Sequence, residues 1–425
     1  MDLSGNHLKG PIPDYFGNMS FLKGVDLSLN SLNSSIPNSL KHCRPQFKSI
    51  LWYTAKTSAI FRIDLELLNL GNNNLIGKIP SSLGDTSLAM LNLRNNSMFG
   101  ELPSTLQNCT DLVILDLSEN HFSGRIPTWI GDKLSNLVVL SLHSNNFDGH
   151  IPHTICTLQS LQNLYLGHNN ILGDIPKCFR NLSAMATKEK QSKYYYQVET
   201  FVRNAYMYTY LIGASLEVKG REDGYSTTLA LVTSIHLSAN SLTGDILEEL
   251  GSLIGLLSLN LSGNLLTGNI PDSIGNMELI ESLDLSMNRL HGGIPSSFSN
   301  LNFLNQLNVS YNNLTGQIPT STKLQSFENS SFMGNHLCGP PVSKNCSTEG
   351  VPTDATKNGE SSGRSKVNGF YVSIVVGFVM GFWGLVAPLF FIRSWRHAYY
   401  AKLEHFGNKL YVFWALRVCN SMGKQ

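Results

Sequence analysis

The sequence predicts a repeat solenoid of the α/β type, and two regularities of the chain carry this prediction. A unit such as LDLSENHFSGRIP, residues 115–127, occurs eleven times in the 425 residues, and most copies follow one another at a distance of 24 residues. Every copy also has an asparagine at the same place. A fixed period of this length is the signature of a solenoid, because one unit cannot bury its apolar side without a neighbour. The repeated asparagines are Asn6, Asn30, Asn73, Asn96, Asn120, Asn145, Asn169, Asn240, Asn264, Asn288 and Asn312.

Each part of the unit has a physical reason. Leu115 and Leu117 alternate with polar residues, which is the pattern of a short strand with one buried face. The amide of Asn120 can donate and accept, so it can bind backbone groups where the chain leaves the strand. Gly124 permits a tight bend, and Pro127 ends hydrogen-bonded structure. The unit is a leucine-rich repeat, and its LxGxIP ending resembles the plant-specific class. That resemblance implies a curved, right-handed superhelix with a concave parallel sheet and a second strand in each repeat.

Composition and sequons indicate the environment of the protein. The net charge is +1 and 14% of the residues are charged, so no field suited to a nucleic-acid partner is expected. N-x-Ser/Thr sequons are frequent, which predicts passage through the secretory pathway and N-glycosylation. They lie at Asn18, Asn33, Asn95, Asn108, Asn181, Asn260, Asn308, Asn313, Asn329 and Asn345.

The first seven repeats are predicted to occupy residues 1–182. A region at 41–66 fits no repeat well, and either a degenerate repeat or an error in the gene model explains it. Met1 lies inside a repeat, with no signal peptide or capping repeat before it. Because a solenoid needs capped ends, we expect an N-terminally truncated piece of a longer protein.

Residues 183–231 interrupt the period. Asn169 and Asn240 lie 71 residues apart, where the usual step is 24. The segment is rich in tyrosine, which favours an insertion that folds, or orders on binding, over a disordered linker. The last four repeats are predicted at 232–319.

A cysteine pair follows the last repeat. Cys338 and Cys346 lie eight residues apart in a predicted C-terminal cap at 320–346, and such a compact pair predicts a disulfide. A metal or redox pair would need further ligands, which the cap does not offer.

The other cysteines follow the repeat less regularly. Cys156 and Cys178 fall in adjacent repeats at slightly different offsets, so they could form a second disulfide. Cys43 and Cys109 each lie six residues after a repeat proline, which indicates a buried free thiol at that position.

The C-terminal part of the chain has the composition of a membrane anchor. Residues 370–392 are 23 residues without charge, and about 20 apolar residues suffice to cross a bilayer. They are predicted to form one transmembrane helix after a polar extracellular linker at 347–369. The tail at 393–425 is basic, so the positive-inside rule predicts a cytosolic C-terminus. We therefore expect a single-pass plasma-membrane protein with its N-terminus outside.

The repeats, the insertion, the LCGPP cap and the single span together are similar to plant leucine-rich-repeat receptor-like proteins, including fungal-elicitor and other disease-resistance receptors. The stretch YSTTLALVTSIHLSAN, from Tyr225, resembles the end of that family's insertion. The resemblance implies that the ectodomain recognises an extracellular peptide, protein or glycan elicitor and signals in plant defence through partner receptor kinases. It further implies an adaptor receptor-like kinase at the membrane helix and a co-receptor kinase at the insertion and last four repeats. No cofactor is implied.

Ligand contact is predicted on the concave face of the middle repeats. Glycans on Asn260 and Asn308 would crowd the later part of that face. Outward-pointing polar and aromatic side chains of the middle repeats are the candidates, since aromatic residues often anchor binding surfaces. They are Arg94, Asp116, Glu119, His143, Tyr165 and His168.

Other functions have weaker support. An enzyme is disfavoured, because the outward residues show no carboxylate pair and no metal-ligand spacing. A secreted binding module is disfavoured by the predicted span. A developmental peptide receptor and a truncated, non-signalling decoy stay open, since outward positions of a solenoid vary freely.

The predicted span contains Gly377, Gly381 and Gly384 on one helical face, a spacing that permits close helix–helix approach in a bilayer. We expect Gly377→Leu with Gly381→Leu to leave membrane insertion intact and to block that approach. Co-precipitation of an adaptor receptor kinase from plant cells should fall severalfold, by about fivefold or more. Equal recovery with the double variant and the parent would contradict this helix contact.

Overall fold

The computed structural model describes residues 1–18, 22–42, 65–188, 197–201, 207–211, 214–218, 221–225, 229–343 and 345–346. Residues Met1–Thr348 belong to one compact unit. Among the described residues, no helix combines the length and apolar character needed to cross a membrane. Outside the described residues lie Cys43, most of the region at 41–66, the predicted linker beyond 346, the predicted span with Gly377, Gly381 and Gly384, and the tail.

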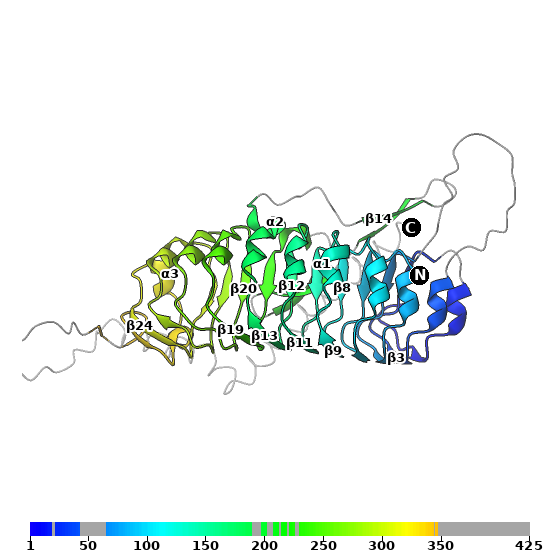
Figure 1. Ribbon diagram of the computed structural model, residues 1–425, viewed down its shortest axis with the longest axis horizontal. Coiled ribbons are helices and arrows are strands. Elements are labelled where there is room, and N and C mark those ends of the chain that lie inside the picture. Colours follow the sequence, from blue (N-terminus) through cyan, green and yellow to red (C-terminus); the bar gives the residue numbers. More distant parts are fainter. Residues whose placement is uncertain are drawn as a thin grey trace, which may run out of the picture. The chain divides into compact units, whose positions relative to one another are not determined.

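The unit is a stack of coils, and each coil adds one strand to a ten-stranded parallel sheet (Figure 1). Equivalent residues of successive coils are in register, so that Leu91 pairs with Leu115 and Leu115 with Leu140. The parallel-sheet solenoid predicted from the period is confirmed. In spatial order the strands are β2 (Gly24–Asp26), β4 (Leu67–Asn69), β6 (Met90–Asn92), β8 (Ile114–Asp116), β10 (Val139–Ser141), β12 (Asn163–Tyr165), β18 (Ser234–His236), β20 (Ser258–Asn260), β21 (Ser282–Asp284) and β23 (Gln306–Asn308).

A second strand follows the turn in most coils, as the LxGxIP ending implies. Its eight-stranded sheet comprises β1 (Lys9–Gly10), β3 (Ser31–Ser34), β5 (Asn74–Gly77), β7 (Ser97–Gly100), β9 (His121–Arg125), β11 (Asn146–Gly149), β13 (Asn170–Asp174) and β19 (Ser241–Thr243). Near the C-terminal end, three strands pair separately, namely β22 (His291–Gly292), β24 (Asn313–Gln317) and β25 (His336–Cys338).

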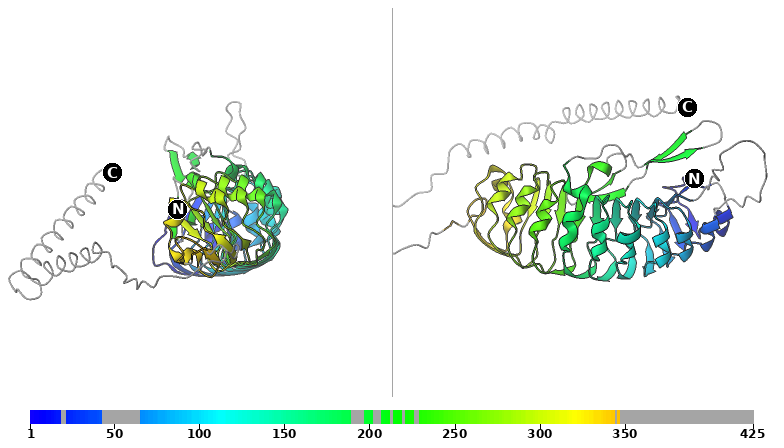
Figure 2. Two further views of the ribbon diagram at one scale, coloured as in Figure 1. Left: turned by 90° about the vertical axis from the view of Figure 1, so that its left-hand side faces the viewer. Right: turned by 45° about the horizontal axis from the view of Figure 1, so that its top comes forward.

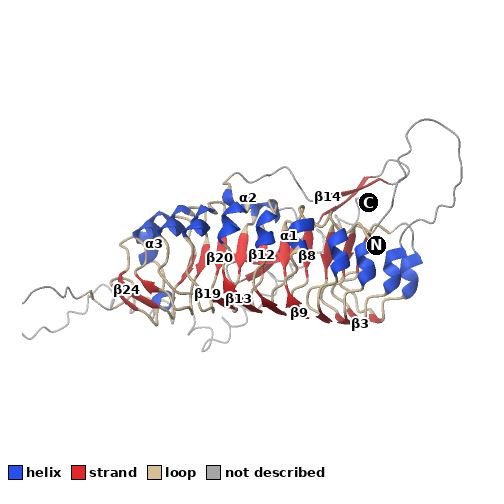
Figure 3. Ribbon diagram, in the orientation of Figure 1, coloured by secondary structure: helices blue, strands red, loops and turns tan. Residues whose placement is uncertain are grey.

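Short helical segments close each coil on the side opposite the second sheet (Figure 3). The repeat proline begins most of them, because its fixed φ and missing N–H suit the position before a helical turn. The 3₁₀ segments are η1 (Asp14–Asn18), η2 (Asn38–His42), η3 (Ser81–Asp85), η4 (Ser104–Asn108), η5 (His153–Thr157), η6 (Lys177–Asn181), η7 (Leu229–Leu231), η8 (Glu248–Ser252), η9 (Asp272–Asn276), η10 (Ser296–Asn300) and η11 (Asn329–Phe332). The α-helical segments are α1 (Trp129–Lys133), α2 (Ser183–Ala186) and α3 (Thr322–Gln325).

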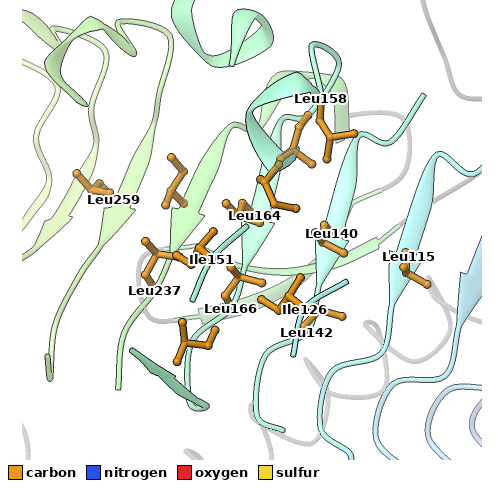
Figure 4. Packing of buried hydrophobic residues seen from close by; sticks show 14 of the residues in the cluster. Leu115, Ile126, Leu140, Leu142, Ile151, Leu158, Leu164, Leu166, Leu237 and Leu259 are labelled. Atoms are coloured by element: carbon orange, nitrogen blue, oxygen red, sulfur yellow. The ribbon is translucent and has the colours of Figure 1, made fainter. Parts of the chain in front are cut away.

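The core is continuous along the stack. Leu115, Leu140 and Leu164 project from adjacent strands into the interior and are fully buried (Figure 4). Ile126 and Ile151, from the LxGxIP endings of two coils, pack against the same core (Figure 4). Each coil therefore buries its apolar side against its neighbours, which is why a single repeat would not fold alone.

The repeated asparagine binds the backbone of two coils at once. Asn120 Nδ2 donates to the carbonyl oxygens of Leu93, Leu117 and Ser118 at 2.9, 3.2 and 3.0 Å, and its Oδ1 accepts from Met98 N at 3.0 Å. The same set of bonds recurs at the other buried members of this asparagine ladder. These bonds supply side-chain donors to the carbonyls of the turn, of which Ser118 O also accepts from Asn95 N of the neighbouring coil at 3.0 Å.

The residue before each ladder asparagine has a left-handed backbone. The φ angle is 54° at Glu119 and 53° at His168. A non-glycine residue in this region costs about 1 kcal/mol or more. The turn tolerates this cost because its N–H groups still bind the next coil, as Glu119 N does with His143 O at 2.9 Å.

The insertion interrupts one coil between its helical side and its strand. Strand β12 precedes the insertion and β18 follows it, yet the two pair directly, Leu164 with Ile235. The stack thus continues with no coil missing. Within the insertion, two antiparallel hairpins are described, formed by β14 (Gln197–Phe201) with β15 (Met207–Leu211) and by β16 (Ala214–Val218) with β17 (Arg221–Tyr225).

The first residues of the insertion pack against the coils that follow it. Figure 2 shows the stacked coils from two further sides, with this region in green. Met185 is buried in the core, and its carbonyl accepts from Gly255 N at 2.9 Å. A Cβ on Gly255 would lie 2.1 Å from Thr187 O, so this close approach requires glycine. Lys188 Nζ then lies 2.6 Å from Glu278 Oε2. These contacts hold residues 183–188 across the junction.

Two disulfides are present in the described residues. Cys338 pairs with Cys346 in the cap, and Cys156 pairs with Cys178, which joins η5 to η6 just before the insertion. Cys109 is a free, buried thiol. Burial raises the pKa of this thiol, because the charged thiolate would lose its hydration.

The sequons differ in exposure. Asn260 and Asn308 are half-buried on the ten-stranded sheet, where each side-chain oxygen accepts from a serine two residues on. Of the others with described side chains, the exposed ones are Asn33, Asn95, Asn108, Asn181, Asn313, Asn329 and Asn345.

The asparagine ladder predicts a large loss of stability for Asn120→Ala. This change removes one donor from each of three interior carbonyls and leaves Met98 N without its acceptor, so the free energy of unfolding should fall by about 3 kcal/mol. Urea unfolding followed by circular dichroism measures it. Asn6→Ala is the matched control, since Asn6 is exposed and binds only the carbonyls of Leu3 and Ser4. Equal losses in both variants would contradict the role of burial.

Candidate functional site

The predicted ligand residues lie together on the face of the ten-stranded sheet that points away from the core, which we call the outer face. They follow or belong to strands β6, β8, β10 and β12, and His236 of β18 joins them. We call this set the strand-face cluster. Its members are Arg94, Asp116, Glu119, His143, Tyr165, His168 and His236.

Arg94 and Glu119 form an ion pair between neighbouring coils. Arg94 Nη2 lies 2.5 Å from Glu119 Oε1, and the two side chains are 14% and 37% exposed. Such a partly exposed pair contributes little stability, but it fixes two long side chains in one arrangement. The edge of the cluster near β6 and β8 is therefore polar and preorganised.

Asp116 lies below that pair and is buried. Its Oδ1 accepts from Ser118 Oγ at 2.6 Å and from Ser118 N at 3.1 Å. Burial raises the pKa of Asp116, although the serine hydrogen bonds and the charge of Arg94 act in the opposite direction. At 1% exposure, Asp116 supports the turn and does not reach the outer surface.

Three histidine rings meet beside this polar edge. The ring centroid of His143 lies 5.0 Å from that of His168 and 5.2 Å from that of His236. Gly167, two residues beyond the end of β12 and so in the coil between them, makes the second contact feasible. A Cβ there would lie 3.1 Å from His143 Nδ1, 3.2 Å from His236 Cδ2 and 3.0 Å from Ser238 Oγ.

The hydrogen bonds of His236 identify its neutral form. Its Nε2 lies 2.6 Å from Ser238 Oγ and 3.1 Å from Asn260 Nδ2. The Asn260 amide is oriented by Ser262, which donates to its Oδ1 from both N and Oγ. The amide therefore presents N–H to the ring, and Nε2 must accept. Burial, together with the charges of His143 and His168, lowers the pKa of His236 from 6.5 to about 3.

Tyr165 is also buried, at 4% exposure, and forms the floor between these rings and the next coil. Its hydroxyl lies 2.6 Å from Ser234 Oγ, and its ring centroid lies 5.7 Å from that of His236. Of the six predicted ligand residues, the outer surface thus retains Arg94, Glu119, His143 and His168, while Asp116 and Tyr165 support them from below.

An apolar surface adjoins the cluster at the beginning of the strands. Leu67, Met90, Ile114 and Val139 occupy equivalent positions in four successive coils. Ala89, Val113 and Val138 precede three of them in the sequence. We call these two rows the apolar columns. Gly24 and Asn163 occupy the same register at either end.

The end of the insertion covers the apolar columns. Ile114 and Val139 are fully buried, although both point away from the main core. They belong to a second hydrophobic cluster that includes Leu229 and Val232, with Tyr225 packed against it. The insertion therefore returns over coils that precede it, and one side of the predicted binding face is closed by the chain itself.

Two features escaped the sequence analysis, although each had a signal. His236 lies at an outward position of the first coil after the insertion, and the resumed period would have placed it beside Tyr165. The column of Leu67, Met90, Ile114 and Val139 shows as apolar residues at outward strand positions, where coils elsewhere have glycine, serine, asparagine or glutamine. Such a row predicts that another part of the chain covers it.

The cluster has the composition of a binding surface. Within the described part of the chain, no group of histidine, cysteine, aspartate or glutamate is placed to hold a metal ion. His236 is buried and Asp116 is bound by serine. What remains exposed can donate or accept hydrogen bonds and stack against a ligand.

Comparison with known proteins agrees with this architecture. The family models described as leucine rich repeat match residues 110–171 and, in six further segments, 1–19, 64–86, 87–109, 255–277, 279–301 and 303–323. Receptor-like protein EIX2 of Solanum lycopersicum is 38% identical over 455 aligned residues, covering 99% of this chain and 44% of the relative. The chain belongs to the plant leucine-rich-repeat receptor-like proteins.

A second relative and a solved structure are also similar to this receptor-like protein. Receptor-like protein EIX1 of Solanum lycopersicum is 45% identical over 69% of this chain and 29% of the relative. The chain thus spans less than half the length of these relatives. The ectodomain of the Arabidopsis receptor kinase HAESA is also similar, and its structure was solved in complex with an N-terminally extended IDA peptide hormone ligand. The TM-score is 0.53, with 26% identity over 81% of this chain and 55% of the HAESA chain.

The buried, neutral His236 predicts a pH dependence of stability. Its pKa is lowered in the folded state, so the unfolded chain binds more protons and folding loses stability as pH falls below about 6.5. Between pH 6.5 and 5 the loss should be about 2 kcal/mol. His236→Gln, which keeps an acceptor for Asn260, should lose clearly less in urea unfolding at pH 7 and pH 5. His121→Gln, at an exposed position, should behave as the parent, and an unchanged pH dependence in His236→Gln would contradict the assignment.

Proposed function

We propose that this receptor-like protein recognises an extracellular peptide, protein or glycan elicitor and signals in plant defence through partner receptor kinases at the plasma membrane. The observation that carries the proposal is the strand-face cluster. Its polar and aromatic side chains are held in place by their neighbours, and they lie beside the apolar columns that the end of the insertion covers. The family supports an extracellular ligand-binding role. The names of the tomato relatives and the peptide bound to the HAESA ectodomain are consistent with such a role.

The ligand would contact the exposed half of the cluster. His168 is exposed, and Arg94, Glu119 and His143 are half-buried or partly exposed. These side chains offer an ion pair, imidazole nitrogens and ring edges. An extended ligand that crosses successive coils would meet Arg94, Glu119, His143 and His168 in chain order, because adjacent parallel strands lie about 5 Å apart.

The co-receptor kinase would contact a different surface, which we call the C-terminal rim. It consists of Met287, Tyr311 and Met333, which are 62%, 55% and 46% exposed. Tyr311 N donates to Met333 O at 2.8 Å, and Met287 occupies the position equivalent to Tyr311 one coil earlier. The φ angles of Met287 and Tyr311 are 54° and 53°. The turn thus holds two apolar side chains outward.

The contrast with earlier coils supports this second surface. At the same turn position the coils from Asn72 to Gly263 have polar or small residues. Leu29 of the second coil is apolar and 59% exposed, but its neighbours at this position are not apolar, whereas the rim is apolar over neighbouring coils. Contiguous exposed apolar side chains commonly mark protein–protein contacts. The residues at this position, in chain order, are Gly5, Leu29, Asn72, Asn95, Glu119, Ser144, His168, Ala239, Gly263, Met287, Tyr311 and Gly334, which follows Met333.

The HAESA complex favours a second candidate function, recognition of a developmental peptide hormone at the same face. A panel of synthetic plant peptide hormones and a fungal culture filtrate, each applied to plant cells that express the chain, separates the two. Extracellular alkalinisation in response to the filtrate alone supports a defence receptor. A response to one peptide alone supports the developmental receptor.

Changing the exposed half of the cluster should weaken that response. We expect His168→Ala with Glu119→Ala to weaken ligand response by about tenfold in half-maximal dose, since hot-spot residues contribute more than about 1 kcal/mol each. Tyr165 is left unchanged, because its truncation would disturb buried packing. His121→Ala, exposed on β9 of the second sheet, is the control. An unchanged dose in the double variant would remove the cluster as the ligand site.

The rim predicts a separate outcome. Met287→Ser with Tyr311→Ala should lower co-precipitation of a co-receptor kinase by about tenfold while ligand binding persists. Phe303→Ser is the matched control, because Phe303 is 58% exposed but lies outside the rim. Equal recovery of the kinase with rim variant and control would contradict the assignment of this surface.

A further inference from the structure

We propose that Met287 and Met333 form a peroxide-sensitive modification site, at which oxidation converts the C-terminal rim from an apolar to a polar surface. Its effect on a co-receptor kinase rests on the function proposed above for the rim. The modification itself does not depend on that function.

The exposure of the methionines makes the site selective. Met287 and Met333 present 62% and 46% of their surface to solvent. Met98, Met185 and Met277 are fully buried in the core of the same unit. A peroxide in solution can reach the first pair without unfolding the protein, whereas the second group reacts only after local opening.

The chemistry is a two-electron oxygen transfer. A sulfur lone pair attacks one peroxide oxygen and the O–O bond breaks. The attacked oxygen loses its proton to the departing hydroxide, which leaves as water. The thioether is oxidised to a sulfoxide, and hydrogen peroxide, the oxidant, is reduced to water. The flexible apolar side chain becomes polar and gains a strong acceptor oxygen.

Tyr311 couples Met333 to the shape of the rim. Its hydroxyl donates to Met333 Sδ at 3.5 Å, and its ring packs on Gly334, where a Cβ would lie 2.8 Å from Cδ1. A thioether is a weak acceptor, and a sulfoxide oxygen is a much stronger one. Oxidation of Met333 would therefore hold the Tyr311 hydroxyl more firmly and pull the ring toward a polar group.

The same contact predicts an order of reaction. Met287 is the more exposed of the two, while the sulfur of Met333 has one lone pair directed at Tyr311. Met287 should therefore oxidise first, Met333 second, and the buried methionines at least roughly tenfold more slowly.

The test uses the purified full chain treated with graded hydrogen peroxide and mapped by peptide mass spectrometry. Retention on a hydrophobic-interaction column measures the polarity of the rim. Affinity for the purified ectodomain of a leucine-rich-repeat co-receptor kinase is measured before and after treatment, in the presence of active fungal filtrate. The variant Met287→Leu with Met333→Leu keeps the rim apolar and cannot be oxidised there.

We expect the parent to lose column retention and about fivefold in affinity as its two sulfoxides form, while the leucine variant keeps both. Oxidation of Met98 or Met277 as fast as Met287 would overturn the site. Full affinity of the oxidised parent would overturn its regulatory effect. If unoxidised Met287→Ser with Tyr311→Ala already binds as well as the parent, the rim function is wrong and the regulatory effect fails with it, whereas the mass data still decide the modification.

Discussion

The structure depends on the way each buried asparagine of the ladder binds the backbone of two coils. The turn after each strand points carbonyl groups into the interior, where water cannot reach them. Asn120 binds three of them together with one N–H of the preceding coil. Because this arrangement repeats, the leucines on either side of it stay in register along the whole stack. The outer face of the sheet can then vary without any change in the interior.

The insertion uses this freedom. It departs on the helical side, where residues 183–188 pack on coils that follow, and it returns over the apolar columns of coils that precede it. The two halves of the stack are thus linked by their own insertion as well as by the pairing of β12 with β18. The cluster of His143, His168 and His236 lies at this junction, so its geometry depends on both halves.

The repeat period predicted the fold well, because the residues that repeat are the ones that form the interior. The leucines, ladder asparagines and turn glycines of one coil have the same neighbours in the next, so their environment follows from spacing alone. The cluster was harder to predict. Tyr165 is buried in the cluster that the end of the insertion joins, and the insertion has no period. His236 was missed because it lies 71 residues beyond Tyr165 in the chain, although it is its direct strand neighbour. The identity of a ligand depends on exposed side chains alone, and these are not constrained by the repeat.

The position of the disulfide between Cys156 and Cys178 in the stack affects how the solenoid would come apart. A solenoid is held by contacts between nearest neighbours, so it can be peeled open at any weak interface. The coil that carries the insertion is such a place, because the insertion separates its helical side from its strand between Lys188 and Leu229. The covalent bond ties that coil to the one before it. An opening that starts at the insertion would therefore stop at this bond on its N-terminal side, and the first coils would keep their structure while the last four come apart.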